Sequence, residues 1–385
     1  MKNIFLFLTL FPTYSIAVLP LKTNSVKPIE KIFQIKMEMN KIEQKEVVET
    51  LRSFIKSSKP NRLMGTPGHT AAVNFIGEFI QANDPHKTGK VSVQEFSPDI
   101  EFAQKFYNLD FKLKVEDKFS KTSAEYKNWK SFTDSMLKAL KDFKKVKGQN
   151  IVWEKKGTTD SDQVIIVGAS YDTLNINAKT NMVDLKGDMP GADKNGTGVV
   201  TLLYLIKELA KYDLKNTVRV VFLDYQGLGF LGAKSYVEEL QNEVLKAKTL
   251  KIMGFIGVEM VGNDSKVFDK EQKLGNMCLY YSLPGKPLYA KENEMALNLS
   301  RIGKEIASDV TFKPMGNGFE YSDNIMFQEA GIPSLVYSQN WETDFNSSRY
   351  HTPDDFVETI NQHTFHKSVQ SINAGVLSMA LNVTK

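Results

Sequence analysis

The fold is decided by a stretch in the middle of the chain, VIIVGASYDT at residues 164–173. Its first four residues are apolar and β-branched, which predicts a strand buried on both faces, and Gly168 ends the run. Similar strand patterns lie at 218–223 and 252–258, with helical apolar patterns at 199–209, 233–246 and 295–307. Buried strands that alternate with helices predict an α/β fold with a largely parallel sheet covered by helices on both faces.

Polar, turn-like segments occur where these strands end, and a parallel sheet usually binds its ligand there. They read GASYDT at 168–173, PGADKNGTG at 190–198, FLDYQGLGFLG at 222–232, YSDN at 321–324, GIP at 331–333 and YHTPDD at 350–355. In order and spacing these segments resemble the M28 family of zinc aminopeptidases, from about Asn61 to Asn382. The resemblance implies a mixed, mainly parallel sheet and a site for two zinc ions that acts on the N-terminus of a peptide.

Four positions that carry the chemistry of this family hold other residue types here. Ser170 stands where the resemblance implies a ligand histidine, and Lys194 stands where it implies a carboxylate that bridges the two metals. Gln226 takes the position of the general base, and Gly227 that of a ligand carboxylate. A hydroxyl is a poor zinc ligand, an ammonium repels cations, an amide has no useful basicity, and glycine has no side chain.

Only Glu259 and His351 occupy ligand positions with side chains that are able to bind zinc. Asn324 replaces a further histidine of the family pattern, whereas Asp172, which orients a ligand in the family, is retained beside Asp193 in the next segment. Two ligands fall short of the three that a catalytic zinc normally has. The sequence therefore predicts a degenerate pocket without zinc or another cofactor, and without peptidase activity.

In this interpretation Lys194 supplies the charge of the lost metal by pairing with Glu259 or Asp172. The protein then binds a ligand or partner, or has a structural role. Two alternatives stay open. One is a remodelled hydrolase with Ser170 as nucleophile, Lys194 as electrophile and Glu259 as base. The other is an aminopeptidase with a single metal held by Glu259, His351 and Asp172.

The chain begins with the features of a signal peptide at residues 1–17: a lysine, an apolar run and the small-x-small motif SIA at 15–17. We therefore expect an exported protein, either periplasmic or secreted. Residues 18–45 are polar and rich in lysine, which predicts an extension ahead of one domain at 46–385. No later run is long and apolar enough for a transmembrane span. The single cysteine, Cys278, excludes a disulfide framework.

A segment at 101–147 interrupts the family resemblance, and we interpret it as an insertion. Alternating apolar residues at 106–116 predict a half-exposed strand, and helical spacing follows at 123–146. The insertion holds 12 Lys against 7 Asp and Glu, whereas the whole chain is nearly balanced at +4. That balance argues against a nucleic-acid-binding protein. The insertion is either a docking face for a partner with an anionic surface or a solvated helix face.

Overall fold

The structure is a computed structural model that describes residues 31–265 and 276–383. The predicted signal peptide at 1–17 lies outside the described residues. The helices are α1 (Ile32–Met39), α2 (Gln44–Ser57), α3 (Pro67–Asn83), α4 (Ile100–Phe111), α5 (Ala124–Ala139), α6 (Thr197–Leu209), α7 (Leu231–Lys246), α8 (Tyr289–Ile306), α9 (Asn324–Glu329) and α10 (Gln362–Ala380). The strands are β1 (Lys90–Phe96), β2 (Gly148–Lys155), β3 (Asp160–Ser170), β4 (Ile176–Asn177), β5 (Met182–Val183), β6 (Asn216–Leu223), β7 (Lys251–Glu259), β8 (Met277–Tyr280), β9 (Phe312–Met315) and β10 (Ser334–Gln339).

One mixed sheet has the strand order β1-β2-β6-β3-β7-β10-β8-β9. Its middle strands β6, β3, β7 and β10 run parallel to one another, as do β8 and β9. Antiparallel pairings join β1 to β2, β2 to β6 and β10 to β8. Three of the middle strands, β3, β6 and β7, contain the apolar runs that predicted the fold. The prediction of an α/β fold with a mixed, mainly parallel sheet is confirmed.

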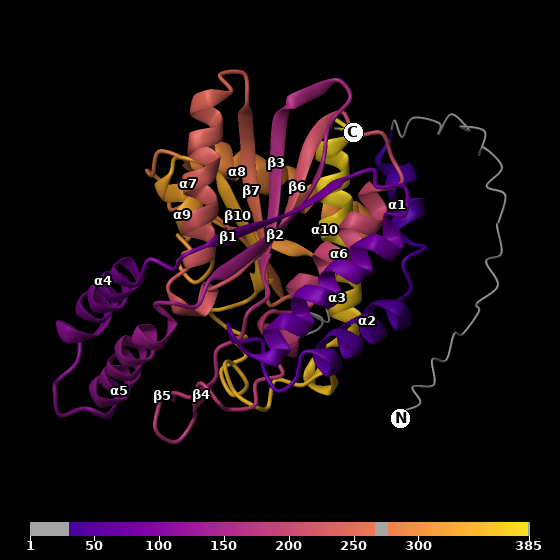
Figure 1. Cartoon of the computed structure of the whole chain (residues 1–385). Coiled ribbons are helices and arrows are strands. Elements are labelled where there is room, and N and C mark those ends of the chain that lie inside the picture. The colour runs from indigo at the N-terminus through magenta and orange to yellow at the C-terminus, as the bar shows by residue number, and fades with distance from the viewer. Residues whose placement is uncertain (1–30, 266–275, 384–385) are drawn as a thin grey trace, which may run out of the picture.

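Strand β3 is buried on both faces, as its apolar run predicts. Val164 and Ile166 belong to a core cluster shared with α7 and α9, while Ile165 and Val167 belong to a larger cluster shared with α2, α6 and α10. Figure 1 shows α7 and α9 on one side of the sheet and α6 and α10 on the other. Each fully buried valine or isoleucine contributes about 1.5–3 kcal/mol relative to exposure, so both layers hold β3 and its carboxyl end in place.

The strand predicted at 106–116 is wrong, because this part of the insertion is helical. Helix α4 begins after Asp99, whose carboxylate caps it by accepting a hydrogen bond from the Phe102 N–H at 3.0 Å, and a short π-helical turn follows at Lys112–Glu116. Ile100, Ala103 and Tyr107 recur at helical spacing and pack into a core cluster. The helix predicted at 123–146 is confirmed as α5 and a following turn. Residues 101–147, which we interpret as an insertion and call by that name below, are therefore a pair of helices that stand together beside the sheet in Figure 1.

Helix α1 lies within the segment that the sequence predicts to be an extension. Its residues Ile32, Ile35 and Met39 are buried in the largest core cluster, and the helix packs on α10. The described end of the predicted extension is thus part of the packed domain. Along the described residues, no helix combines the length and the apolarity that crossing a bilayer requires.

Candidate functional site

The predicted site residues gather at the edge of the sheet where its parallel strands end. Ser170 is the last residue of β3 and Glu259 is the last residue of β7. Gln226 and Gly227 lie in the turn after β6, and Lys194 lies in the turn before α6. Because β6, β3 and β7 are parallel neighbours, their carboxyl ends bring these residues together.

Lys194 and Glu259 form a buried ion pair. The Lys194 Nζ lies 2.6 Å from the Glu259 Oε1, and the two side chains are only 6% and 1% exposed. The sequence predicted a pairing of Lys194 with Glu259 or Asp172, and the structure selects Glu259. The Asp355 carboxylate holds the Lys194 backbone by accepting a hydrogen bond from its N–H at 2.9 Å. Ionised groups this deeply buried stay charged only when each has a partner, so the pair is a fixed element of the site.

The Gln226 side chain joins this pair to a third acidic residue. Its Oε1 accepts a hydrogen bond from the Lys194 Nζ. Its Nε2 donates to the Glu259 Oε2 at 2.9 Å and to the Asp323 Oδ2 at 2.8 Å. An amide can accept at one end and donate at the other, which a carboxylate at this position could not do. Gln226 is thus fitted to a site that holds an ammonium and two carboxyl groups.

Burial shifts the acidic groups of the site toward their neutral forms. Burial, together with the charge of Asp224, raises the pKa of Asp172 to about 6. Its two oxygens accept hydrogen bonds from the Gln226 N–H at 3.0 Å and the Gly227 N–H at 3.2 Å. Burial raises the pKa of Asp323 to about 8, and the charge of Glu259 adds to the rise. Asp323 was not among the predicted site residues, although its neighbour Asn324 was.

Three predicted residues are bound to neighbouring loops and not to the ion pair. Asp193 accepts hydrogen bonds from the Gly262 N–H at 2.9 Å and the Asn346 amide at 3.3 Å, and burial with the Asp355 charge raises its pKa to about 7. Asn324 donates to the Phe319 carbonyl at 3.0 Å. The His351 Nδ1 lies 2.7 Å from the Leu174 carbonyl oxygen. Asp193 is thus bonded to the loop after β7, Asn324 to the turn before α9, and His351 to the segment after β3.

The His351 ring has one hydrogen-bond partner among the described residues, and the Ser170 hydroxyl has none. Burial and the charge of Lys194 lower the pKa of His351 to about 3, so the ring is neutral at neutral pH. The Ser170 Oγ is buried and has no hydrogen-bond partner among the described residues. Nothing in the described contacts therefore activates this hydroxyl as a nucleophile.

The insertion contacts two of the loops that carry site residues. The Tyr107 hydroxyl of α4 donates to the Gly227 carbonyl oxygen at 2.8 Å. The Lys114 Nζ lies 5.1 Å from the centre of the Tyr321 ring and 3.9 Å from the Glu320 Oε2, just before Asp323. The insertion thus reaches from the turn after β6 to the turn before α9. Sequence reasoning missed Tyr107 and Lys114 because no local pattern shows which distant loop a side chain will contact.

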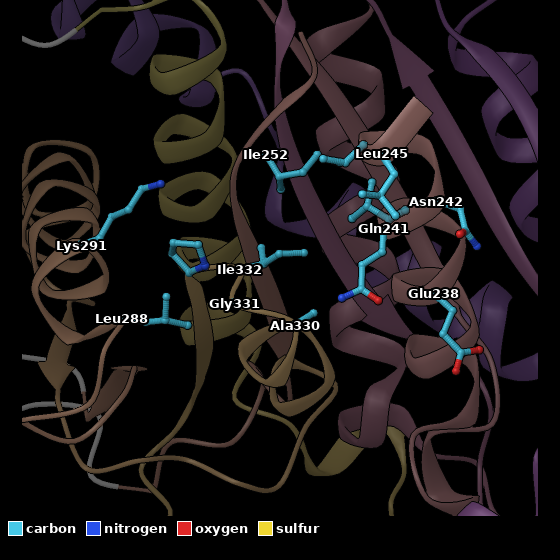
Figure 2. A pocket seen from close by; sticks show the side chains of 13 residues that line it. Glu238, Gln241, Asn242, Leu245, Ile252, Leu288, Lys291, Ala330, Gly331 and Ile332 are labelled. Atoms are coloured by element: carbon cyan, nitrogen blue, oxygen red, sulfur yellow. The ribbon is translucent and has the colours of Figure 1, made fainter. Parts of the chain in front are cut away.

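A surface groove of about 970 Å³ lies at the other edge of the sheet. Figure 2 shows its lining, with Leu245 from the end of α7, Ile252 from the start of β7, Leu288 beside α8, and Ile332 just before β10. The amino ends of the parallel strands lie at this edge. The groove contains none of the predicted site residues and is separate from the Lys194 site.

No group of three or more His, Cys, Asp or Glu residues in the described part of the chain is arranged to hold a metal ion. The candidates Glu259 and His351 are both at the site, but the Glu259 carboxylate already contacts Lys194 and Gln226.

Sequence comparison gives one family match and several partial relatives. Peptidase family M28 matches residues 150–376. A probable zinc metalloprotease of Pyrenophora tritici-repentis is 31% identical over 211 residues, which is 49% of this chain and 45% of that protein. Aminopeptidase YwaD of Bacillus subtilis is 26% identical over 241 residues, which is 62% of this chain and 46% of that protein. The matched region spans about half the length of these curated relatives.

Solved structures share the fold at low sequence identity. A zinc aminopeptidase from Bacillus subtilis aligns with a TM-score of 0.61 and 18% identity, covering 88% of this chain and 95% of that one. A glutaminyl cyclase from Bacteroides thetaiotaomicron, bound to N-acetylhistamine, aligns with a TM-score of 0.58 and 15% identity, covering 89% and 98%. These likenesses concern the fold, because function depends on the residues of the site.

Proposed function

The chain belongs to peptidase family M28, and from this premise we propose that it is a member without peptidase activity, in which Lys194 replaces the metal charge. The site then serves to bind a ligand or partner, or to stabilise the domain. The observation that carries the proposal is the 2.6 Å contact between the Lys194 Nζ and the Glu259 Oε1 in the interior. We further propose that the protein is exported by the predicted leader at residues 1–17.

The residues of the site do not fit a zinc ion. Of the positions that would bind zinc in the resemblance, Glu259 and His351 alone have suitable side chains, and Lys194 and Gln226 occupy both oxygens of Glu259. A cation bound there would also lie close to the Lys194 ammonium, which repels it strongly in a buried site.

The residue at the position of the general base supports the same proposal. Gln226 stands where the family resemblance places the general base, and both ends of its amide are engaged by charged groups. An amide nitrogen does not accept a proton from water at neutral pH. Removing a proton from an attacking water would need another group, and the buried Asp323 is biased toward its protonated form by its raised pKa.

The two alternative functions receive less support from the contacts. A serine hydrolase would need a base beside the Ser170 Oγ, which has no described partner, while the Lys194 ammonium is paired with Glu259. A single metal held by Glu259, His351 and Asp172 would have to share Asp172 with the backbone N–H groups that donate to both of its oxygens. The single-metal arrangement also leaves unexplained why an ammonium lies in the middle of the site.

Metal analysis and peptidase assays test the proposal. Purified protein incubated with excess zinc and then dialysed should retain far less than a stoichiometric amount, and amino-acyl chromogenic substrates should stay intact with or without zinc. The double variant Ser170→His/Lys194→Asp is the matched control, because it restores an imidazole and a carboxylate beside Glu259 and His351 and should gain zinc. Stoichiometric zinc and cleavage of N-terminal residues by the unmodified chain would refute the proposal.

A further inference from the structure

Exposed apolar side chains are concentrated on the insertion. Leu109, Leu113, Phe119 and Trp129 are all large, apolar and exposed, with Leu113 at 58% and Phe119 at 39%. The insertion also packs against β5, where Met182 is exposed as well. Scattered single cases are normal on a protein surface, but a group within one small element marks a contact surface.

The insertion also carries the positive charge of the chain. Residues 101–147 hold 12 Lys against 7 Asp and Glu, and the remainder holds 37 Lys and Arg against 38 Asp and Glu. Without the insertion the protein would be nearly neutral. Apolar exposure and basic charge thus occur together on the same pair of helices.

The end of this helical hairpin combines both properties in a short connection. Phe111 of α4 and Tyr126 of α5 are in ring contact at 5.5 Å, so the residues between them form the far end of the hairpin. In that connection Lys118, Phe119 and Lys121 are all exposed, as are Glu116 and Asp117, and residues 112–123 hold four lysines against these two acids. Neither Lys118 nor Lys121 forms an ion pair within the described residues, whereas Lys130 on α5 is paired with Asp134. Figure 1 shows α4 and α5 projecting away from the sheet.

We propose that this end of the hairpin, residues 112–123, binds the surface of an anionic lipid bilayer. Lysines beside an exposed aromatic ring fit the boundary between headgroups and acyl chains, where the ring is buried and the ammonium groups meet lipid phosphates. Heparin or another soluble polyanion without aromatic groups would use the lysines but would leave Phe119 and Leu113 in water. The apolar residues therefore favour a lipid surface.

Vesicle co-sedimentation of the full chain tests this inference. We expect binding to vesicles of about three parts phosphatidylcholine to one part phosphatidylglycerol, and little binding to phosphatidylcholine alone, with a loss of affinity as salt is added. Replacing both lysines, Lys118→Ala/Lys121→Ala, should weaken binding about fivefold for each charge removed. Phe119→Ala should weaken it about tenfold by removing apolar area from the interface.

The end of α7 offers a matched control of the same composition. Leu245 is exposed there and is followed by the exposed lysines Lys246 and Lys248. Leu245→Ala and Lys246→Ala/Lys248→Ala should leave vesicle binding unchanged. An equal loss in these variants would overturn the inference, because binding would then follow total charge and apolar area instead of this site.

Fluorescence supplies a readout at the proposed contact itself. Phe119→Trp should add an emission that shifts to the blue with anionic vesicles, and Leu245→Trp should not. The inference fails if the unmodified chain binds neither type of vesicle, or if the emission of Phe119→Trp does not shift. A third outcome also contradicts the inference: heparin binds as tightly as anionic vesicles, and Phe119→Ala changes neither the affinity for heparin nor the affinity for vesicles. The surface would then recognise soluble polyanions.

Discussion

At the scale of single residues, one lysine decides the charge of the candidate site. The ammonium of Lys194 gives one positive charge to a site that contains the carboxyl groups of Glu259, Asp172 and Asp323. The Gln226 amide donates hydrogen bonds to two of these groups, Glu259 and Asp323. The charge of the site is therefore balanced by the Lys194–Glu259 ion pair together with the protonated or partly protonated Asp323. The stability of the site depends on each partner of that pair.

Replacing Lys194 with an apolar residue should destabilise the domain strongly. Lys194→Met leaves Glu259 buried without its cation, and breaking a buried pair from one side costs on the order of 3–5 kcal/mol. The double variant Lys194→Met/Glu259→Gln removes both charges and should recover most of the loss. Urea unfolding gives the free energies. Lys41, which pairs with Glu38 on the surface, is the control, and Lys41→Met should change stability by less than about 1 kcal/mol. Equal effects of Lys194→Met and Lys41→Met would contradict the buried pair.

The pKa of Asp323 predicts a pH dependence with a definite sign. Its pKa rises from 3.8 to about 8 on folding. The neutral acid therefore stabilises the folded state fully below pH 3.8, and this contribution is lost as the pH rises from 3.8 through about 8. Asp323→Asn cannot ionise and should flatten the fall in stability over that range, by at most about 1.4 kcal/mol per pH unit. Unfolding at a series of pH values measures this slope.

A suitable control for the pH series is Asp99→Asn. Burial acts to raise the pKa of Asp99, but the hydrogen bonds of its carboxylate and the charge of Lys234 together lower it by more. The group therefore stays ionised throughout the pH range of the experiment. The variant keeps a side-chain oxygen that can cap α4 and should not change the slope between mildly acidic and alkaline pH. If Asp323→Asn keeps the slope of the unmodified protein, Asp323 is not the titrating group.

Side-chain direction limits what the sequence can tell about single residues. The resemblance led us to Lys194, Gln226 and Glu259, and these three are in direct contact. It also led to Asn324, although the side chain that contacts Gln226 is that of the preceding residue, Asp323. Neighbouring residues in a turn point in different directions, and only the tertiary structure shows which of them faces the site.

Among the secondary-structure elements, the insertion shows how a short pattern can mislead. Apolar residues alternate from Tyr107 to Val115, as in a strand, but the helix starts earlier, at the Asp99 cap. Ala103, Phe106 and Tyr107 then pack inward at helical spacing, and this packing outweighs the local alternation. If the pattern is taken from Asp99 onward, it includes the N-cap of α4 and favours a helix.

The same helix pair should limit access to the site. Tyr107 and Lys114 attach the insertion to the two loops that carry Gly227 and Asp323, so Tyr107→Phe/Lys114→Ala should loosen it. A thiol introduced by Ser170→Cys, with the native thiol removed by Cys278→Ser, reports on access. Its reaction with a maleimide should become about fivefold faster or more when the two attachments are removed, because local opening becomes less costly.

Lys130 provides the control for this labelling experiment. It lies on the same insertion but pairs with Asp134 of its own helix, so Lys130→Ala should leave the reaction rate unchanged. If the rate is the same with and without Tyr107 and Lys114, the insertion does not cover the site.

At the scale of the whole molecule, the sequence predicted the centre of the sheet better than its edges. β3, β6 and β7 are continuous apolar runs because helices cover both of their faces. The edge strand β1 is mostly exposed, and β8 and β9 are short. Such strands gain their identity from pairing with a neighbour, as β1 does with β2, and this pairing is not visible in a local pattern.

The two ends of the described chain meet in one core, and this predicts a role for α1. Ile35 on α1 is fully buried against the layer that contains α10, while Phe33, two residues earlier, is 66% exposed. The carbonyl oxygens of Met39 and Ile42 lie 2.9 Å from the Gln370 amide and 2.7 Å from the His366 ring, both on α10. Ile35→Ala should therefore lower the free energy of unfolding by about 2–5 kcal/mol, and Phe33→Ala by less than about 0.5 kcal/mol. Calorimetry or urea unfolding measures both. If Ile35→Ala were as mild as Phe33→Ala, α1 would be an appendage and the domain would begin at α2, as the sequence alone suggests.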